Sequence, residues 1–252
     1  GGILALMERL DGLLDGTALT VTGRSIGEGF AKAPCWNEDV IRPLDRPVST
    51  EPAMAVLYGN LAPDGCVMKP SAAAPHLLNH TGPALVFDSY AELKDRLDDE
   101  ALDVTADTVL IMRGAGPQGG PGMPEWGMLP IPRKLLRAGV RDMLRISDAR
   151  MSGTSYGACI LHVSPEAHVG GPLALVQSGD IVKVDVAARR IDMLVSEAEL
   201  AERRATLPAP QPRFERGYGW MFSRHIRQAH EGCDFDFLET GFGASPGEPA
   251  IL

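Results

Sequence analysis

One segment limits what this 252-residue chain can fold into more than any other. It runs from Arg113 to Glu125, RGAGPQGGPGMPE, and holds five glycines and three prolines in 13 residues. Because proline removes a backbone donor and glycine lacks a Cβ, neither a helix nor a central strand is expected to pass through it. Ordering such a loop costs conformational entropy. We therefore expect either a tight bend between strands or a loop whose bare backbone permits a close approach.

Nucleotide binding is a third interpretation of this segment. Residues 114–119 match GxGxxG after a predicted strand. A dinucleotide-binding fold needs a helix to begin there, so that its N-terminus can receive the pyrophosphate. Pro121 and Pro124 disfavour that helix, and no GKS or GKT motif of a P-loop is present. Glu125 ends the segment, and a carboxylate on a rigid loop is a good ligand for a hard metal ion.

A second segment, Ser147 to Gly157 (SDARMSGTSYG), is rich in hydroxyl groups. Such a run can offer hydroxyls and backbone N–H groups to an anion. Alternatively, the hydroxyls cap the turn or helix that follows. Arg150 and Met151 stand directly before Ser152, so the GxSxG motif is absent and an ordinary nucleophile elbow is disfavoured.

Three arginines near this segment are open to two interpretations. Arg141, Arg145 and Arg150 could balance a substrate carboxylate, or they could pair with Asp142 and Asp148. The sequence alone does not choose between the two. No HExxH motif occurs, and the histidines are expected to be core or surface residues.

The charge balance excludes some partners. The chain has 24 basic and 33 acidic residues, a net charge of −9. This surface repels nucleic acid and anionic membranes, because phosphate binding needs clustered Lys and Arg. An anionic small substrate would need a local cation to overcome the same field. No window approaches 18 uninterrupted apolar residues, so no transmembrane helix is expected.

Four cysteines without a CxxC pair suit a reduced, cytoplasmic protein. The N-terminal residues GGILALMERLDGLLDG predict an amphipathic helix over 2–15. They do not predict a signal peptide, because acids interrupt the apolar stretch and no basic flank precedes it. Since the chain lacks an initiating methionine, we expect it to begin inside a longer protein.

Strands dominate the predicted organisation from residue 51 to 205. Thr81-Gly82-Pro83 predicts a turn, and a β-prone run covers 18–22. The pattern indicates an α+β, mainly β, barrel-like domain over 46–206, with flanking pieces at 1–45 and 207–252. Strands are expected near 53–58, 66–69, 85–87, 107–112, 144–146, 158–162, 182–186 and 191–195, and helices near 89–100, 130–138, 196–205 and 217–231. The alternating strands 182–186 and 191–195 predict an antiparallel hairpin. Ser89 with Glu92, and Ser196 with Glu199, have the spacing that caps the start of a helix.

Three stretches together resemble one protein family. They are GNLAPDGCVMKPSAA (59–73), GAGPQGGPGMPEWGMLPIPRKLL (114–136) and RISDARMSGTSYGACILHVSPEAHVGGPLALVQSGD (145–180). In this order they resemble the C-terminal part of the dihydroxy-acid dehydratase / phosphogluconate dehydratase family. The sugar-acid branch (pentonate or hexonate, for example arabinonate or xylonate) is similar through PEWGMLPIP, SDARMSGTSYGA and the tail GYGWMFSRHIRQAHEGCDFDFL. Branched-chain biosynthetic members carry a TDGRFSGG-like loop instead.

The resemblance implies a fold and a reaction. The fold is a swivelling β-barrel-like C-terminal domain with flanking helices, packed on an α/β N-terminal domain. The reaction is loss of water from a 2,3-dihydroxy acid, here a sugar acid (aldonate), to give a 2-keto-3-deoxy acid. The implied cofactors are an Fe–S cluster of the 2Fe–2S type and Mg²⁺. An iron that takes the 3-hydroxyl and a Mg²⁺ that stabilises an enolate suit this chemistry, because hydroxide leaves poorly and the C2 proton is weakly acidic.

The resemblance also assigns three residues. Ser152 takes the role of C2 proton acceptor, which a hydroxyl can perform only close to strong positive charge. Thr154 holds the substrate or Ser152 by hydrogen bonding. Glu125 corresponds to the Mg²⁺ ligand that this half of the protein contributes.

The family's cluster cysteines, its other Mg²⁺ ligands and its modified lysine lie in an N-terminal domain that these residues lack. We therefore assign none of the four cysteines as ligands: Cys35, Cys66, Cys159 and Cys233. We expect this chain alone to bind no cluster and to have no activity. The expected partners are the missing N-terminal domain and a sugar-acid substrate, and the resemblance implies a homo-dimer or tetramer. Alternatives are a branched-chain dihydroxy-acid dehydratase, a non-catalytic sugar-acid-binding domain, and the nucleotide-binding module considered above.

Overall fold

The computed structural model describes residues 1–50 and 53–238. The chain divides into two compact units, Gly1–Pro52 and Ala53–Leu252. The predicted boundaries near residues 45 and 206 stay predictions. No helix in the described residues is both long and apolar enough to cross a bilayer.

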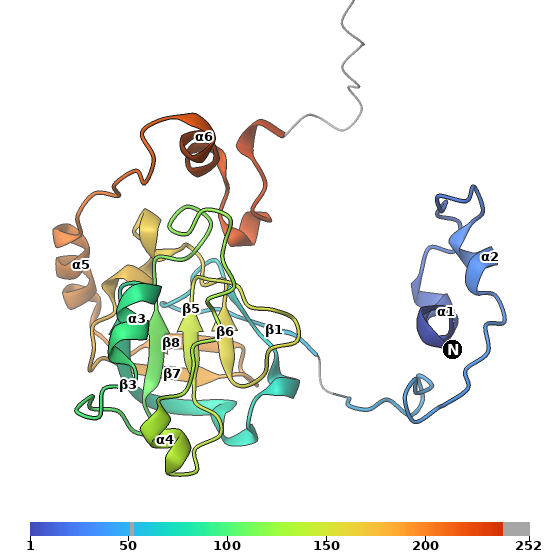
Figure 1. The fold of residues 1–252 in the computed structure, drawn as a ribbon, viewed down its shortest axis with the longest axis horizontal. Coiled ribbons are helices and arrows are strands. Elements are labelled where there is room, and N and C mark those ends of the chain that lie inside the picture. The colour runs from blue at the N-terminus through green and yellow to red at the C-terminus, as the bar shows by residue number, and fades with distance from the viewer. Residues whose placement is uncertain (51–52, 239–252) are drawn as a thin grey trace, which may run out of the picture. The chain divides into compact units, whose positions relative to one another are not determined.

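The larger unit is built on a mixed sheet of eight strands (Figure 1). The strand order is β1-β2-β6-β5-β4-β3-β7-β8. The four central strands run parallel, and the outer pairs are antiparallel. The strands are β1 (Ala55–Leu57), β2 (Cys66–Met68), β3 (Asn79–Phe87), β4 (Val109–Met112), β5 (Arg145–Ser147), β6 (Cys159–Leu161), β7 (Ile181–Asp185) and β8 (Arg190–Met193).

A backbone link joins the first and last strands of this sheet. The N–H of Tyr58 donates to the carbonyl of Arg189 at 3.0 Å, and the N–H of Ile191 donates to the carbonyl of Tyr58 at 3.0 Å. Pairing of the two edges protects them and nearly closes the sheet into a barrel. The predicted α+β, mainly β, barrel-like fold class is confirmed.

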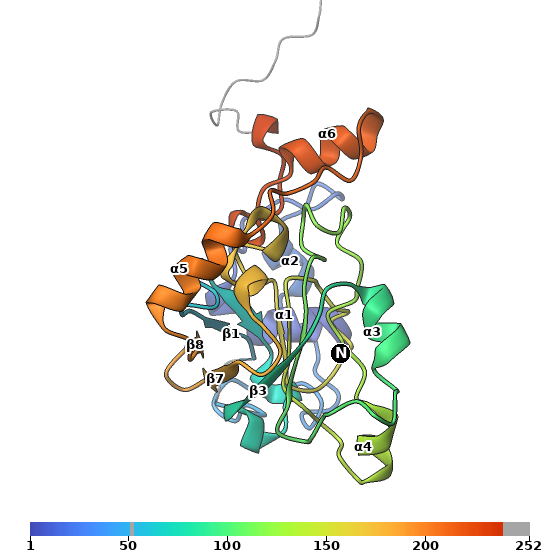
Figure 2. The ribbon, with the colours of Figure 1, turned by 90° about the vertical axis from the view of Figure 1, so that its left-hand side faces the viewer.

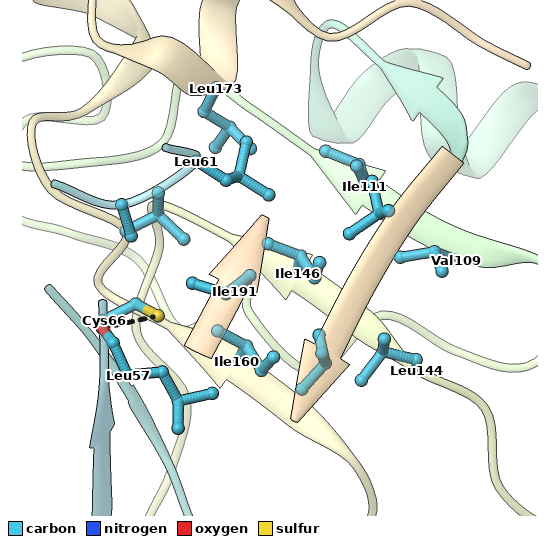
Figure 3. Packing of buried hydrophobic residues seen from close by; sticks show 14 of the residues in the cluster. Leu57, Leu61, Cys66, Val109, Ile111, Leu144, Ile146, Ile160, Leu173 and Ile191 are labelled. Atoms are coloured by element: carbon cyan, nitrogen blue, oxygen red, sulfur yellow. Dashed lines mark hydrogen bonds between the residues drawn. The ribbon is translucent and has the colours of Figure 1, made fainter. Parts of the chain in front are cut away.

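The core follows from the two-residue period of the strands. In β4, Val109 and Ile111 belong to the cluster inside the barrel, whereas Leu110 and Met112 belong to a second cluster under α3. Such a strand is buried on both faces and is therefore apolar throughout. Figure 3 shows the inner cluster, in which Ile146, Ile160 and Ile191 from three different strands pack together.

Helices cover the barrel on opposite sides (Figure 2). The helices α3 (Tyr90–Arg96) and α4 (Arg133–Arg137) lie on one side and α5 (Glu197–Thr206) on the other. Ser89 and Ser196 cap α3 and α5 through the N–H groups of Glu92 and Glu199, as their spacing predicted. The last helix, α6 (Gly217–His225), ends six residues before the predicted Glu231.

Two predicted elements are wrong. Thr81-Gly82-Pro83 forms no turn but continues β3, where Gly82 pairs with Val182 of β7. A Cβ at Gly82 would lie 1.9 Å from the carbonyl oxygen of Asp107, so the glycine serves a close backbone approach rather than a reversal. Residues 18–22 form only an isolated bridge between Leu19 and Ser25 instead of a strand.

The smaller unit contains α1 (Gly2–Arg9) and α2 (Ile26–Phe30). The predicted helix over 2–15 thus ends early and is followed by a 3-10 turn at Asp11–Leu13. Among the described residues of this unit, Ala5 and Phe30 are the buried apolar side chains. Many large apolar side chains are exposed: Ile3, Leu4, Leu6, Leu13, Leu14, Leu19, Val21, Trp36, Val40, Leu44 and Val48. Their exposure is unusual for an isolated folded unit.

Candidate functional site

The two segments that the sequence singled out follow neighbouring parallel strands. We name residues 113–127 the glycine-rich loop and residues 148–157 the serine loop. The first follows β4 and the second follows β5, whose last residues Met112 and Ser147 are paired. Because the carboxyl ends of parallel strands meet at one edge, both loops begin side by side. This edge is a common place for ligand binding in sheets of this kind.

A buried carboxylate holds the start of the glycine-rich loop. Asp148 is fully buried and accepts hydrogen bonds from the backbone N–H groups of Gly114 (3.0 Å), Ala115 (2.9 Å) and Ala167 (3.0 Å). Burial raises the pKa of Asp148 to about 6, against the opposing effect of these donors. The negative charge of nearby Glu166 raises it further.

A second buried carboxylate holds the middle of the loop. Glu166 accepts from the N–H groups of Gln118 and Gly119, both at 2.8 Å, and from the side-chain amide of Gln228 at 2.9 Å. Burial raises the pKa of Glu166. Four backbone donors of the GxGxxG segment thus bind the protein's own acids, so they are not free to hold a phosphate. This argues against the nucleotide-binding interpretation.

The glycine-rich loop needs glycines because other groups of the protein lie very close to its backbone. A Cβ at Gly116 would lie 2.6 Å from Oε2 of Glu166, closer than real Cβ contacts. A Cβ at Gly119 would lie 2.9 Å from the backbone oxygen of Gly114. Of the predicted alternatives, the bare backbone that permits a close approach describes this loop best, and the group that approaches is an internal carboxylate.

Glu125 lies where the two loops touch. Its carboxylate is half exposed and pairs with the Arg150 guanidinium at 3.4 Å. Arg150 also donates from Nε to the carbonyl of Met123 at 2.7 Å, and its own carbonyl accepts from the N–H of Gly127 at 2.8 Å. The neighbouring Trp126 stacks on Tyr90 with ring centroids 4.9 Å apart. Contacts on both sides therefore fix the backbone that carries Glu125.

Ser152 and Thr154 form a hydroxyl pair on the serine loop. Their oxygen atoms lie 2.9 Å apart, and the N–H of Thr154 donates to Oγ of Ser152 at 3.4 Å. Lys69 donates from Nζ to the carbonyls of Gly153 (2.8 Å) and Ser155 (3.1 Å). The ammonium group thus ties the loop to the residue after β2 and places positive charge near the pair. The predicted residues Ser152 and Glu125 lie on loops joined through Arg150.

The three arginines that could bind a substrate carboxylate or pair with Asp142 and Asp148 make different contacts. Arg145 is buried and pairs with Asp142 at 2.7 Å, beneath the serine loop. Arg150 pairs with Glu125, while Asp148 binds backbone N–H groups rather than an arginine. Arg141 donates to the carbonyl of Leu136 near the end of α4.

The two buried cysteines, Cys66 and Cys159, are poor candidates for metal ligands. Burial raises the pKa of the Cys66 thiol to about 12 and that of Cys159 to about 11, so the thiolate form is disfavoured. Within residues 1–50 and 53–238, no group of three His, Cys, Asp or Glu side chains is arranged to hold a metal ion.

Sequence reasoning missed four residues that build this edge. Asp148 was considered only as an arginine partner, although an acid directly after a buried strand is a usable signal. Lys69, Glu166 and Gln228 gave no such signal, because each comes from a distant part of the chain.

The nearly closed barrel thus carries a carboxylate and a hydroxyl pair on adjoining loops at the carboxyl ends of its parallel strands, the edge at which sheets of this kind commonly bind ligands. A family model described as "Dihydroxy-acid/6-phosphogluconate dehydratase C-terminal" matches residues 39–233. The chain therefore belongs to this family and represents its C-terminal part. The resemblance drawn from the three sequence stretches is confirmed.

Relatives include enzymes of both substrate groups. The chain is 57% identical over 244 residues to the 6-deoxy-6-sulfo-D-gluconate dehydratase of Pseudomonas putida, covering 96% of this chain and 42% of the relative. It is 47% identical over 253 residues to the L-arabonate dehydratase of Azospirillum brasilense, covering 97% and 43%. It is 42% identical over 238 residues to the dihydroxy-acid dehydratase of Carboxydothermus hydrogenoformans, covering 93% and 42%. The chain thus spans about two fifths of the length of these relatives.

Proposed function

We propose that the full-length protein is a hydro-lyase that dehydrates a sugar acid to a 2-keto-3-deoxy acid. One observation carries this proposal: Glu125 and the Ser152–Thr154 pair lie on loops that leave adjacent strands and are joined through Arg150. The named activities of the similar proteins, a sulfogluconate and an arabonate dehydratase, support the substrate class.

Ser152 is the proposed acceptor of the C2 proton. Its oxygen already receives a hydrogen bond from the N–H of Thr154, and it lies 2.9 Å from the Thr154 hydroxyl. Donors and nearby positive charge favour the ionised form of a hydroxyl. Lys69 supplies one such charge to the backbone of this loop.

The proposed reaction balances as a simple elimination. The C2–H bond breaks and its proton goes to the ionised Oγ of Ser152, while the electron pair forms the C2–C3 double bond. The C3–O bond breaks, and the leaving hydroxide takes up one proton, equal to the one that Ser152 then gives up to return to its ionised form, and becomes water. The resulting enol then tautomerises to the 2-keto-3-deoxy acid, so no oxidant or reductant is consumed.

Glu125 fits the proposed role of Mg²⁺ ligand, because it is a half-exposed carboxylate on a fixed backbone. A bound Mg²⁺ would supply positive charge that stabilises developing negative charge on the substrate. Cys66 and Cys159 fit an iron–sulfur cluster poorly, since burial raises the pKa of both thiols. No group of three His, Cys, Asp or Glu side chains in the described part of the chain is arranged to hold a metal ion. The proposed 2Fe–2S cluster therefore needs ligands from outside this chain.

The proposed partner is an N-terminal domain of the same protein. The chain covers 42% of the relative from Pseudomonas putida, and the smaller unit exposes apolar side chains such as Leu4 and Trp36. An α/β domain that covers this surface would bury them. We propose that the whole protein forms a homo-dimer or tetramer in the cytoplasm.

A substrate panel on the full-length protein tests the function. The panel contains arabinonate, gluconate, 6-deoxy-6-sulfogluconate and 2,3-dihydroxyisovalerate, and formation of the 2-keto acid is measured. We expect the best sugar acid to exceed dihydroxyisovalerate by at least about tenfold in kcat/KM, a difference that one or two unpaired polar groups can produce. The reverse order would favour the branched-chain alternative, which the Carboxydothermus hydrogenoformans relative represents.

The metal role has its own test. Glu125→Gln keeps the size of the side chain but removes its charge, so the Mg²⁺ concentration needed for half-maximal activity should rise by tenfold or more. Glu202→Gln, an exposed change on α5, is the matched control. Equal Mg²⁺ dependence of both variants would contradict the assignment of Glu125.

A further inference from the structure

A pocket of about 310 Å³ lies between the glycine-rich loop and the C-terminal part of the larger unit. Figures 1 and 2 both show α6 at the end of the barrel where the loop after β4 lies. The side-chain amide of Gln118 donates to the carbonyl of Ile226 at 3.3 Å and joins the two walls. The lining residues are Gln118, His168, Pro210, Pro212, Arg213, Phe214, Trp220, Ser223 and Arg224.

The pocket gathers positive charge on a protein whose net charge is −9. Arg213 and Arg224 line it, and within the described residues neither makes an ion pair. No acidic side chain is among the described lining residues. Most other arginines near the barrel have carboxylate or carbonyl partners, as Arg113 and Arg203 do. Two arginines without an ion-pair partner beside one cavity suit an anionic ligand.

A hydroxyl adds a third donor. Oγ of Ser223 on α6 is buried and has no hydrogen-bond partner among the described residues. A buried polar atom without a partner costs about 1–3 kcal/mol, so such an atom beside a cavity indicates a ligand that would satisfy it. The two guanidinium groups and this hydroxyl match a group with three acceptor oxygens better than a carboxylate, which has two.

The other charged groups around the pocket are consistent with this ligand. Burial and the charge of Arg213 lower the pKa of His168, against the opposing effect of Asp148. Glu166 does not line the pocket, and N–H groups of Gln118, Gly119 and Gln228 bind its carboxylate. Its negative charge also interacts with Arg213, so this arginine is partly compensated from inside the protein. Trp220 and Phe214 give the pocket an apolar side that would contact the carbon chain of an organic anion.

We propose that this pocket binds the sulfonate or phosphate group of a small organic molecule, with Arg213 and Arg224 as the charged contacts and Ser223 as the third donor. The group could belong to the distal end of the sugar-acid substrate, which rests on the proposed function, or to a separate effector. The chemistry of recognition is the same in both cases.

Calorimetry on the full-length protein tests the site with inorganic sulfate and inorganic phosphate as probes. Arg213→Gln and Arg224→Gln should each weaken binding about tenfold or more, because each removes charge-assisted hydrogen bonds. Ser223→Ala should weaken it less. Arg216→Gln is the matched control, since Arg216 is exposed on the same segment and does not line the pocket. No binding of either probe, or equal binding by all four variants, would overturn the proposal.

Kinetics separate the two sources of the anion. If the group is the distal end of the substrate, Arg213→Gln and Arg224→Gln raise KM for 6-deoxy-6-sulfogluconate but not for gluconate. If it belongs to an effector, both KM values stay unchanged while calorimetric binding is lost. Calorimetry needs no turnover, so a protein that dehydrates no sugar acid yet binds sulfate through these arginines would refute the proposed function and retain the pocket.

Discussion

The glycine-rich loop and the serine loop leave adjacent strands, yet the protein uses them in opposite ways. The first turns its backbone donors inward to Asp148 and Glu166, and Gly116 and Gly119 are needed because Glu166 and the loop's own backbone approach them closely. In the second, Gly157 packs against Arg145 at the end of the loop, but the middle is open: nothing lies within 4 Å of a Cβ built on Gly153. Its Ser152 hydroxyl interacts only with the adjacent Thr154 among the described residues.

This difference shows that glycine content alone does not identify a ligand-binding loop. The backbone N–H groups of a glycine-rich loop can instead bind a carboxylate of the protein itself. We propose that the glycine-rich loop serves as a fixed support for Glu125 and that the hydroxyls of the neighbouring loop carry the chemistry. Four comparisons of variants test that division of roles.

The largest expected effect is on the serine loop. Ser152→Ala in the full-length protein should lower kcat by about 10²- to 10⁴-fold, the contribution typical of a positioned proton acceptor, while the protein stays folded. Ser155→Ala, the same change three residues later, is the control and should stay within a few-fold of wild type. Unchanged turnover of Ser152→Ala would support the alternative of a non-catalytic sugar-acid-binding domain.

The second effect concerns the buried acids under the glycine-rich loop. The pKa of Asp148 is about 6 in the folded protein against a usual value of 3.8, so the folded state holds a proton more tightly. The stabilisation by this proton is complete below about pH 4 and is lost as the pH rises through 6. Its size is on the order of 3 kcal/mol. The pKa of Glu166 is raised too and acts in the same direction.

The measurement is thermal unfolding of wild type and Asp148→Asn between pH 4.5 and 7.5. Because asparagine does not titrate, Tm of the variant should fall less than that of wild type over this range. Parallel Tm curves would show that Asp148 is ionised throughout and that the loop is held by a permanent charge.

A smaller effect is expected from two matched glycine substitutions. Gly116→Ala places a methyl group 2.6 Å from Oε2 of Glu166 and should lower the free energy of unfolding by about 1–3 kcal/mol. Gly153→Ala meets no atom within 4 Å and should change it by less than about 0.5 kcal/mol. Denaturant unfolding measures both, and equal losses would contradict the contrast between the loops.

The smallest effect is expected from Lys69, whose ammonium group binds the backbone of the serine loop. Lys69→Met keeps most of the length of the side chain but removes its two hydrogen bonds to the carbonyls of Gly153 and Ser155. Because Lys69 is only partly buried, each such bond contributes about 0.5 kcal/mol. We expect kcat to fall by up to about tenfold with a small change in Tm. Arg141→Met, which removes a contact at α4, is the control.

Local signals predicted much of the fold. The apolar run of β4, the alternating hairpin of β7 and β8, and the serine caps of α3 and α5 each depend on neighbouring residues, so the sequence was sufficient. The turn at 81–83 failed because the backbone of Asp107, distant in sequence, approaches Gly82. A local rule cannot anticipate a contact of that kind.

The candidate site also contains residues that the sequence predicted from local motifs and residues that only tertiary contacts reveal. Ser152, Thr154 and Glu125 were named from motifs, and their proposed roles remain predictions. Glu166 and Gln228 were not found, because their partners lie 47 to 62 residues away along the chain and only the closed barrel brings them together. Tertiary contacts of this kind leave no local pattern in the sequence.

The most direct test of the central claim follows the C2 proton itself. The full-length protein is incubated with C2-deuterated substrate, and the rate of C2–D cleavage is measured by mass spectrometry or NMR. Wild type should cleave the bond, whereas Ser152→Ala should bind the sugar acid but cleave C2–D at least about 10²-fold more slowly. Equal rates of C2–D cleavage in both proteins would show that another group accepts the proton.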